Sequence, residues 1–208
     1  MIFTHVPATF SICSNIPGHK KVIHVVSNGD TQKLVDEMVQ IQLEQQASAS
    51  KLMRNKFEPI LSTLQARVDI FKMLHPDYDK DSLEVRNFKR MNSLLSSLQK
   101  YCDQLPVIGF NSQRYDIPLI KRYLPASLQR LDSLPHFIIR KTNSYMALAT
   151  KRLKFLDMVN YLAAGTSLNS FYEAFKVQTP KGFFPYEWFD SLEKLKAPAL
   201  PSQAEFYN

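Results

Sequence analysis

The stretch VIGFNSQRYDIPLIKRY, residues 107–123, decides the fold that we predict for this chain of 208 residues. Its first four residues are β-prone and bounded, which predicts a short buried strand. Ile117, Leu119 and Ile120 then recur at near-helical spacing, and Pro118 fits a first helical turn. Between strand and helix, an Asn amide, a Tyr ring and an Asp carboxylate can point into one cleft. The stretch therefore predicts a strand, a polar edge and a helix.

Upstream of this stretch the sequence predicts a hairpin followed by two helices. Residues 8–13 and 22–26 are β-prone and are separated by a Pro-Gly turn. Residues 30–103 then carry apolar residues at steps of three and four, which predicts a helical hairpin of roughly coiled-coil character. Pro59 lies inside the first helical pattern, so we expect either a kink or a new helix there.

Downstream of the stretch the pattern changes to three short strands and a short amphipathic helix: 136–140, 145–149, 153–156 and 167–175. A further helix is predicted over 186–195. Strands that alternate with helices in this way predict an α/β protein, with a mixed sheet flanked by helices. The length allows one core, or one core with an appended subdomain.

Composition narrows the class of protein. Hydrophobic residues make up 45% of the chain, which argues against wholesale disorder. Two cysteines provide neither a disulfide scaffold nor a zinc site, and a reducing intracellular location fits them. No apolar run approaches the length of a membrane span. The net charge of +7 suits a phosphate backbone, although a basic surface without a partner explains it equally well.

Three blocks resemble one protein family, in the same order along the chain. They are GFNSQRYD (109–116), KFLDMVNYL (154–162) and KGFFPYEWFDSLEKL (181–195). The first resembles the second exonuclease motif of family B DNA polymerases, in particular the protein-primed kind found in adenoviruses, some phages and Polinton/Maverick transposable elements. The other two resemble downstream parts of the same 3′–5′ exonuclease domain. The resemblance covers most of the chain and is strongest from residue 105 onward.

The resemblance implies a ribonuclease-H-like exonuclease fold, in which a sheet presents carboxylates to two divalent metal ions. Mg²⁺ or Mn²⁺ ions about 3.5–4 Å apart activate a water and stabilise the leaving oxygen of the terminal phosphodiester. Asp116 takes the position of a catalytic, metal-binding carboxylate; a helix N-cap ahead of Pro118 is the alternative from the residues alone. Lys181 matches a motif lysine that steadies the scissile phosphate or the attacking water. An ordinary surface lysine is the alternative there.

The same resemblance implies contacts with the single-stranded 3′ end of DNA. Asn111 matches the motif Asn that touches this end, and Tyr115 matches an aromatic residue able to stack on a base. For Tyr115, packing in the core is the alternative. Further contacts are implied at the segment that lines the single-strand path and beside the DNA end: Asp157, Met158, Val159 and Tyr186.

Two parts of the family pattern have no counterpart in this sequence. The first exonuclease motif, Asp-x-Glu, precedes the hairpin in the family and has no counterpart in this sequence. The third, a Tyr-x-x-x-Asp that is expected on a later helix, has no counterpart after the three blocks, and the polymerase palm is absent as well. We therefore expect residues 1–208 to be a partial exonuclease domain with a helical insertion over about 30–103. As part of a DNA-directed DNA polymerase it would lack both nucleotidyl transfer and proofreading by itself.

The expected partner is a single-stranded DNA 3′ end, together with a terminal protein primer or the rest of the polymerase, and no membrane. The family implies the nucleus as the compartment. A competing hypothesis is a domesticated, non-catalytic module that binds single strands, or a partner protein through the helical hairpin. A third is a product that does not fold stably, because a missing first strand leaves an open sheet edge.

Overall fold

The computed structural model describes residues 7, 9–76, 82–135, 137–141, 144–178, 188, 191, 193–194 and 202. The chain divides into two compact units, residues 1–157 and residues 158–208. The described part of the second unit contains a short 3₁₀ helix, η1 (Met158–Tyr161), and the predicted amphipathic helix, α5 (Leu168–Ala174), capped by the Ser167 hydroxyl. The helix expected over 186–195 lies largely outside the described residues. One domain over 1–208 stays a prediction.

The first unit begins with the predicted hairpin. Strands β1 (Thr9–Cys13) and β2 (Val22–Val26) pair antiparallel and form a two-stranded sheet of their own. Gly18 in the connecting turn has a φ of 82°, a left-handed conformation that glycine adopts without strain. The turn is held to the following helix by a hydrogen bond of 2.8 Å between His19 and the Ser48 hydroxyl.

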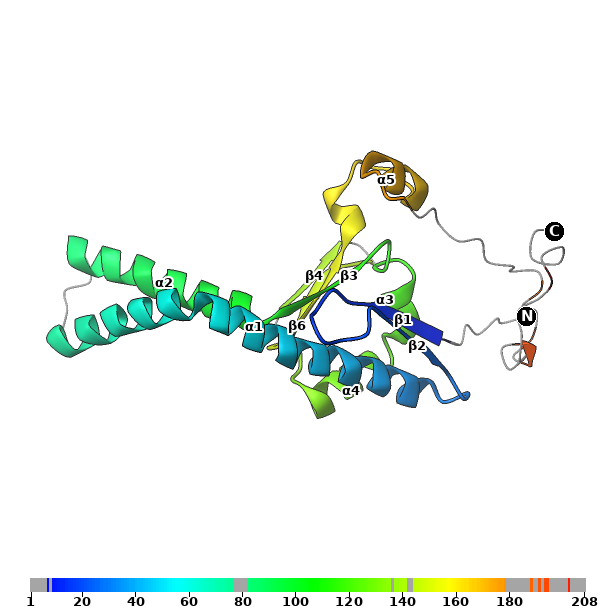
Figure 1. The fold of residues 1–208 in the computed structure, drawn as a ribbon, viewed down its shortest axis with the longest axis horizontal. Coiled ribbons are helices and arrows are strands. Elements are labelled where there is room, and N and C mark those ends of the chain that lie inside the picture. The colour runs from blue at the N-terminus through cyan, green and yellow to red at the C-terminus, as the bar shows by residue number, and fades with distance from the viewer. Residues whose placement is uncertain are drawn as a thin grey trace. The chain divides into compact units, whose positions relative to one another are not determined.

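The helical hairpin is also confirmed, as α1 (Thr31–Leu74) and α2 (Leu83–Asp103). Asp30 caps α1, because its carboxylate accepts a hydrogen bond from the Lys33 N–H. The distal parts of the two helices, residues 51–76 and 82–103, lie side by side and project away from the sheets (Figure 1). We call these residues the arm.

The arm has a small core of its own. Val68, Phe88 and Leu95 are buried between the two helices, and the rings of Phe71 and Phe88 stack with centroids 4.3 Å apart. Leu61 packs against this cluster, whereas Ile60 is half exposed although its spacing also fits the apolar stripe. The apolar seam therefore passes through Leu61 rather than Ile60.

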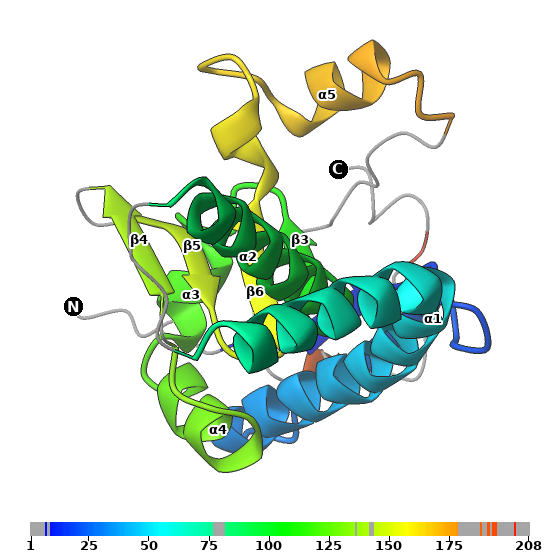
Figure 2. The ribbon, with the colours of Figure 1, turned by 90° about the vertical axis from the view of Figure 1, so that its left-hand side faces the viewer.

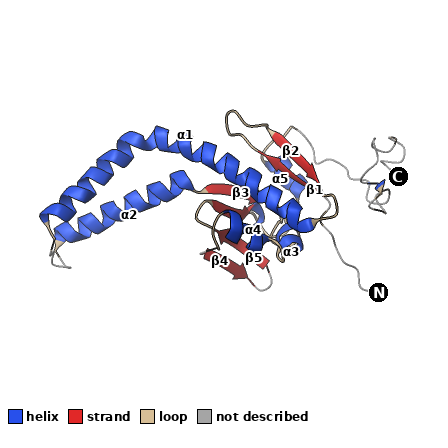
Figure 3. Ribbon diagram, turned by 90° about the horizontal axis from the view of Figure 1, so that it is seen from below, coloured by secondary structure: helices blue, strands red, loops and turns tan. Residues whose placement is uncertain are grey.

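Pro59 lies inside α1 and does not begin a new helix, so that alternative was wrong. Proline removes one backbone N–H donor from a helix and commonly bends it. Figure 3 shows that α1 changes direction along its length. The carbonyl of Pro59 also accepts hydrogen bonds from the hydroxyls of Ser62 and Thr63.

The larger sheet has four strands in the order β3-β6-β5-β4. They are β3 (Leu105–Gly109), β4 (Phe137–Lys141), β5 (Ser144–Ala149) and β6 (Leu153–Asp157). Strands β3 and β6 run parallel, whereas the β4–β5 and β5–β6 pairs are antiparallel. The prediction of a mixed α/β protein with a helical hairpin is thus confirmed.

Two short helices follow β3, and together with α1 they cover one face of this sheet. They are α3 (Asp116–Ile120) and α4 (Leu124–Leu131). Figure 2 shows α4 beside the N-terminal half of α1. The core between helices and sheet consists of the following buried residues: Val35, Val39, Leu43, Ile117, Leu124, Leu128, Leu148, Leu153 and Phe155. On the opposite face Ile108 is 59% exposed, and no described helix of the first unit packs a comparable buried cluster there.

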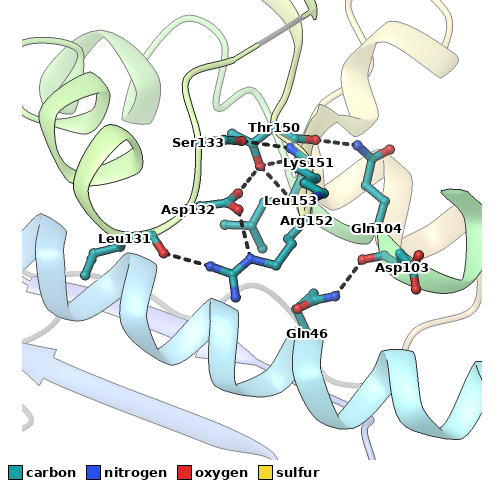
Figure 4. Close-up of polar contacts among 10 residues, drawn as sticks. All are labelled: Gln46, Asp103, Gln104, Leu131, Asp132, Ser133, Thr150, Lys151, Arg152 and Leu153. Atoms are coloured by element: carbon teal, nitrogen blue, oxygen red, sulfur yellow. Dashed lines mark hydrogen bonds and ion pairs between the residues drawn. The ribbon is translucent and has the colours of Figure 1, made fainter.

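A polar network ties the β5–β6 turn to the end of α4 (Figure 4). The buried carboxylate of Asp132 accepts hydrogen bonds from the Arg152 guanidinium, at 2.8 Å, and from the Thr150 hydroxyl. Arg152 also donates to the Leu131 carbonyl, at 2.7 Å. Because the Asp132 carboxylate and the Arg152 guanidinium both form hydrogen bonds, their ion pair stabilises the connection between helix and sheet.

Within the described residues, no helix combines the length and the apolar composition that a bilayer crossing requires. The absence of a membrane partner stays a prediction.

Candidate functional site

The two parallel strands end at the same edge of the sheet. Gly109 is the partner of Asp157 in the register of β3 and β6, and each is the last residue of its strand. The carboxyl ends of parallel strands are the usual position of ligand sites in α/β sheets. The motif residues that follow β3 are thereby placed beside the end of β6.

Asp157 holds the loop that follows β3. Its side chain is 2% exposed. Its Oδ1 accepts a hydrogen bond from the Asn111 N–H at 2.8 Å, and its Oδ2 accepts one from the Gln113 N–H at 2.9 Å. Hydrogen bonds from backbone N–H groups to an ionised carboxylate are stronger than neutral ones. Asp157 therefore acts as an anchor for the loop, and its contact with DNA stays a prediction.

The backbone of the loop makes a close turn over Gly109. A Cβ atom added at Gly109 would lie 2.6 Å from both Cβ and Oγ of Ser112, so only glycine fits without a shift. Asn111 has a φ of 60°, in the left-handed region where Asn is among the better tolerated non-glycine residues. Asn111 is thus selected partly by backbone geometry, which is a second reason for its presence in the motif.

Tyr115 and Asp116 lie on the exposed side of this loop. Tyr115 is 65% exposed, which excludes the alternative that it packs in the core. Asp116 is the first residue of α3 and is exposed, while the N-cap position belongs to Tyr115, which forms no side-chain cap. The alternative that Asp116 is the N-cap was therefore wrong. An aromatic ring and a carboxylate are presented together at the strand ends.

The pKa of Asp116 is raised from its ordinary value of 3.8. The larger cause is desolvation by the surrounding loop, and the negative charge of Asp157 adds to it. A hydrogen bond to the backbone opposes both effects without cancelling them. The carboxylate of Asp116 thus lies close enough to Asp157 for the two charges to repel, and folding makes its ionised form less stable.

We expect Asp116→Asn to stabilise the fold at neutral pH by less than about 1 kcal/mol, because solvent screens charges on an exposed side chain. A carboxyl group whose pKa is raised by folding stabilises the protein below its unfolded pKa and loses that contribution as pH rises through the folded pKa. The advantage of Asn should therefore disappear below about pH 3.8, the ordinary value. The five-residue helix α3 provides little dipole to oppose it.

Urea unfolding from pH 3 to pH 8 measures this effect. Glu37→Gln, which neutralises an exposed carboxylate on α1, is the control. If Asp116→Asn and the control depend on pH in the same way, the carboxylate is not strained by its surroundings.

Three basic residues lie near the loop in the sequence and on the surface: Arg114, Lys121 and Arg122. All are exposed, and the ion pairs found among the described residues use other arginines, namely Arg54, Arg130 and Arg152. These cations are therefore available to an anionic partner. Their side chains suit neutralisation of phosphates next to a stacked base.

The remaining predicted residues are Met158, Val159, Lys181 and Tyr186. Met158 and Val159 are half-buried residues of η1, in the second unit. Lys181 and Tyr186 lie outside the described residues, so whether Lys181 shares a cleft with Asp116 is not decided. Their roles stay predictions.

The oxygen atoms that are available as ligands decide whether this site could hold a metal ion. Both oxygens of Asp157 accept backbone N–H groups, which leaves the Asp116 carboxylate as the exposed oxygen donor of the pair. Among the described residues, no three His, Cys, Asp or Glu side chains are grouped in a way that could hold a metal ion. Since a two-metal reaction needs several carboxylates, these residues alone do not fit such a centre.

The anchoring role of Asp157 was missed from the sequence. The signal that could have revealed it is spacing: Asp157 follows Leu153 and Phe155 at steps of two, which predicts that its carboxylate lies on the buried face of the strand. No protein-family model, no curated protein and no solved structure matches this chain.

Proposed function

We propose that this chain is part of the 3′–5′ exonuclease region of a protein-primed family B DNA polymerase, with a ribonuclease-H-like fold. In this proposal it binds the single-stranded 3′ end of DNA at the edge where β3 and β6 end. The observation that carries it is the presentation of the exposed Tyr115 ring and the exposed Asp116 carboxylate on a loop anchored by Asp157.

Each part of this loop has a task in the proposal. The Tyr115 ring stacks on the terminal base, an interaction that accepts any base because each has a π-face. The side-chain amide of Asn111 bonds the sugar or base of the same nucleotide. The exposed cations that follow neutralise the phosphates behind it. Anchoring by Asp157 keeps these groups in place before DNA arrives, which lowers the entropic cost of binding.

Cleavage is not part of what the chain does by itself in this proposal. Asp116 would be one ligand of the metal centre, and further carboxylates would have to come from residues beyond those described. The non-catalytic binding module remains the second candidate, because the same loop supports binding without hydrolysis. We expect no shortening of a labelled oligonucleotide in Mg²⁺ or Mn²⁺. Shortening that disappears in Asp116→Ala would contradict the expectation of inactivity.

The binding site itself is tested with a short oligothymidylate that has a free 3′ end, followed by fluorescence anisotropy. We expect Tyr115→Ala to weaken binding about tenfold, because stacking on an aromatic side chain contributes about 1–3 kcal/mol per base. Tyr115→Phe keeps the ring and is the matched control, with affinity within about twofold of the parent. Equal affinities of the Ala and Phe variants would remove Tyr115 from the site.

Two substitutions of Asn111 distinguish the role of its backbone conformation from that of its side-chain amide in the same assay. Asn111→Gly keeps the left-handed φ and removes the amide, so it should retain stability and lose affinity. Asn111→Ala should also lose about 1 kcal/mol of stability through strain. If Asn111→Gly binds as the parent does, the motif Asn serves the turn alone.

A further inference from the structure

The outward face of α2 carries cations and hydroxyl groups along most of its length. At steps of three and four residues, which keep side chains on one side of a helix, the sequence places these exposed residues: Arg86, Lys89, Arg90, Ser93, Ser97 and Lys100. Glu84 lies one turn before the buried Phe88 and so on another side of the helix. We call Lys89, Arg90 and Lys100 the basic strip.

Among the described residues, no ion pair balances the charge of the strip. The described arm carries nine Lys or Arg and four Asp or Glu residues, a net +5, whereas the whole chain carries +7. Within the described arm, Arg54 forms an ion pair with Asp103, and this pair uses none of the strip residues. Lys89, Arg90 and Lys100 form no ion pair with any described residue. The arm therefore projects a positive surface that suits an anionic partner.

The strip leads to a cleft at the base of the arm. Lys100 and Tyr101 line this cleft together with Lys154 of β6, and its volume is about 690 Å³. Tyr101 is 62% exposed and meets Phe57 edge to face, with ring centroids 6.0 Å apart. Lys154 comes from a different element, so two cations and one exposed ring converge on the cleft from the arm and the sheet.

The apolar residues of this face do not favour a protein helix as the partner. Leu83, Leu94 and Tyr101 are exposed along one side of α2, but they are separated by eleven and seven residues. A helix that packs on another needs apolar contacts at steps of three and four, and Asn87 and Arg90 occupy the intervening positions. Cations and hydroxyl groups next to an isolated aromatic ring are typical of surfaces that follow a phosphate backbone.

We propose that the basic strip and the cleft form a second, end-independent contact for single-stranded nucleic acid. The phosphates lie along Lys89, Arg90 and Lys100, and a base enters the cleft to stack on Tyr101, with Lys154 beside its phosphate. Both this contact and the proposed function involve a single-stranded nucleic acid as the partner, but the two contacts use different residues of the chain. It does not require a free 3′ end, because none of its groups reads a terminus.

A closed circle of single-stranded thymidylates tests this contact, since a circle has no 3′ end to offer the loop after β3. We expect the parent protein to bind the circle, with an affinity that falls steeply with salt. Lys89→Glu/Arg90→Glu should weaken binding about tenfold or more and lower the slope of log K against log salt by about two. Tyr101→Ala should weaken it severalfold, and Tyr101→Phe should not.

The matched control is Lys33→Glu/Arg67→Glu, which changes the net charge equally at exposed positions of α1 outside the strip and the cleft. It should stay within about twofold of the parent if binding is local rather than a response to total charge. Equal losses in the strip and control variants would overturn the proposal. So would competition by polyglutamate as strong as that by the circle, because the strip would then be a surface for acidic proteins.

The two sites fail separately in this design. If the circle does not bind while a short linear strand still binds through Tyr115, the second contact is wrong and the proposed function stands. If the circle binds through the strip while Tyr115→Ala has no effect on linear strands, the second contact stands and the 3′-end site of the proposed function is wrong. Thermal unfolding of each variant confirms that these exposed replacements leave the fold intact.

Discussion

Replacing Asp157 with Ala is expected to lower the free energy of unfolding by about 3 kcal/mol, since each buried donor left without a partner costs about 1–3 kcal/mol. The donors are the Asn111 and Gln113 N–H groups, which now bond to its two oxygens. Losing the repulsion between Asp157 and Asp116 offsets a small part of this cost. The loop would lose its anchor, so affinity for a 3′ end should fall with stability.

A graded series sharpens this prediction. Asp157→Asn keeps one acceptor oxygen but turns an NH₂ group toward the other donor, so its loss should be intermediate. The pKa of Asp116, followed by NMR titration, should return toward its ordinary value of 3.8 in both variants. Asp69→Ala removes an exposed carboxylate on α1 and should cost less than about 0.5 kcal/mol. An Asp157→Ala protein as stable as the parent would mean that the loop finds other acceptors.

The second large effect is expected at Gly109. Gly109→Ala places a Cβ atom 2.6 Å from the Cβ and Oγ of Ser112, and no rotation of the serine side chain moves its Cβ. Overpacking of this kind costs about 1–3 kcal/mol, and we expect about 2 kcal/mol here. Urea unfolding measures the loss, and single-strand affinity reports whether the loop has been displaced.

Ser112→Gly provides the rescue. By itself it should cost about 0.5–1 kcal/mol, through greater freedom of the unfolded chain. Combined with Gly109→Ala it removes both clashing atoms, so the double variant should be more stable than Gly109→Ala alone. The coupling energy between the two sites should then be about 1–2 kcal/mol. Strictly additive losses would contradict the close approach of the two residues.

Periodicity in the sequence was enough to predict most of the elements. Spacings of three and four predicted the two helices of the arm, and alternation predicted the hairpin and the strands β4, β5 and β6. The effect of Pro59 was only partly predictable, because tertiary packing of the arm keeps α1 continuous through a residue that opposes helix. The pairing of strands into two separate sheets could not be derived from local patterns.

The site was predicted only in part, and what the sequence could not reveal has a different physical reason at each residue. The exposure of Tyr115 follows from tertiary placement, which no local pattern of one aromatic residue reveals. Asp157 was predicted to contact DNA, but whether a carboxylate faces a ligand or its own backbone depends on loop geometry. The left-handed φ of Asn111 and the close approach at Gly109 are likewise consequences of the turn. Lys181 lies outside the described residues and cannot be judged.

Among the described strands, β3 lies at the end of the larger sheet, and this position has a consequence for self-association. An unpaired border strand is a template on which a second molecule can add a strand of its own. Leu105 donates its N–H to the Arg152 carbonyl, so in a parallel ladder the polar groups of Pro106 and Ile108 point toward the unpaired border. Proline has no N–H to offer, which leaves Ile108 as the strand's outward donor. This border is thereby a poor seed for fibril-like stacking of copies.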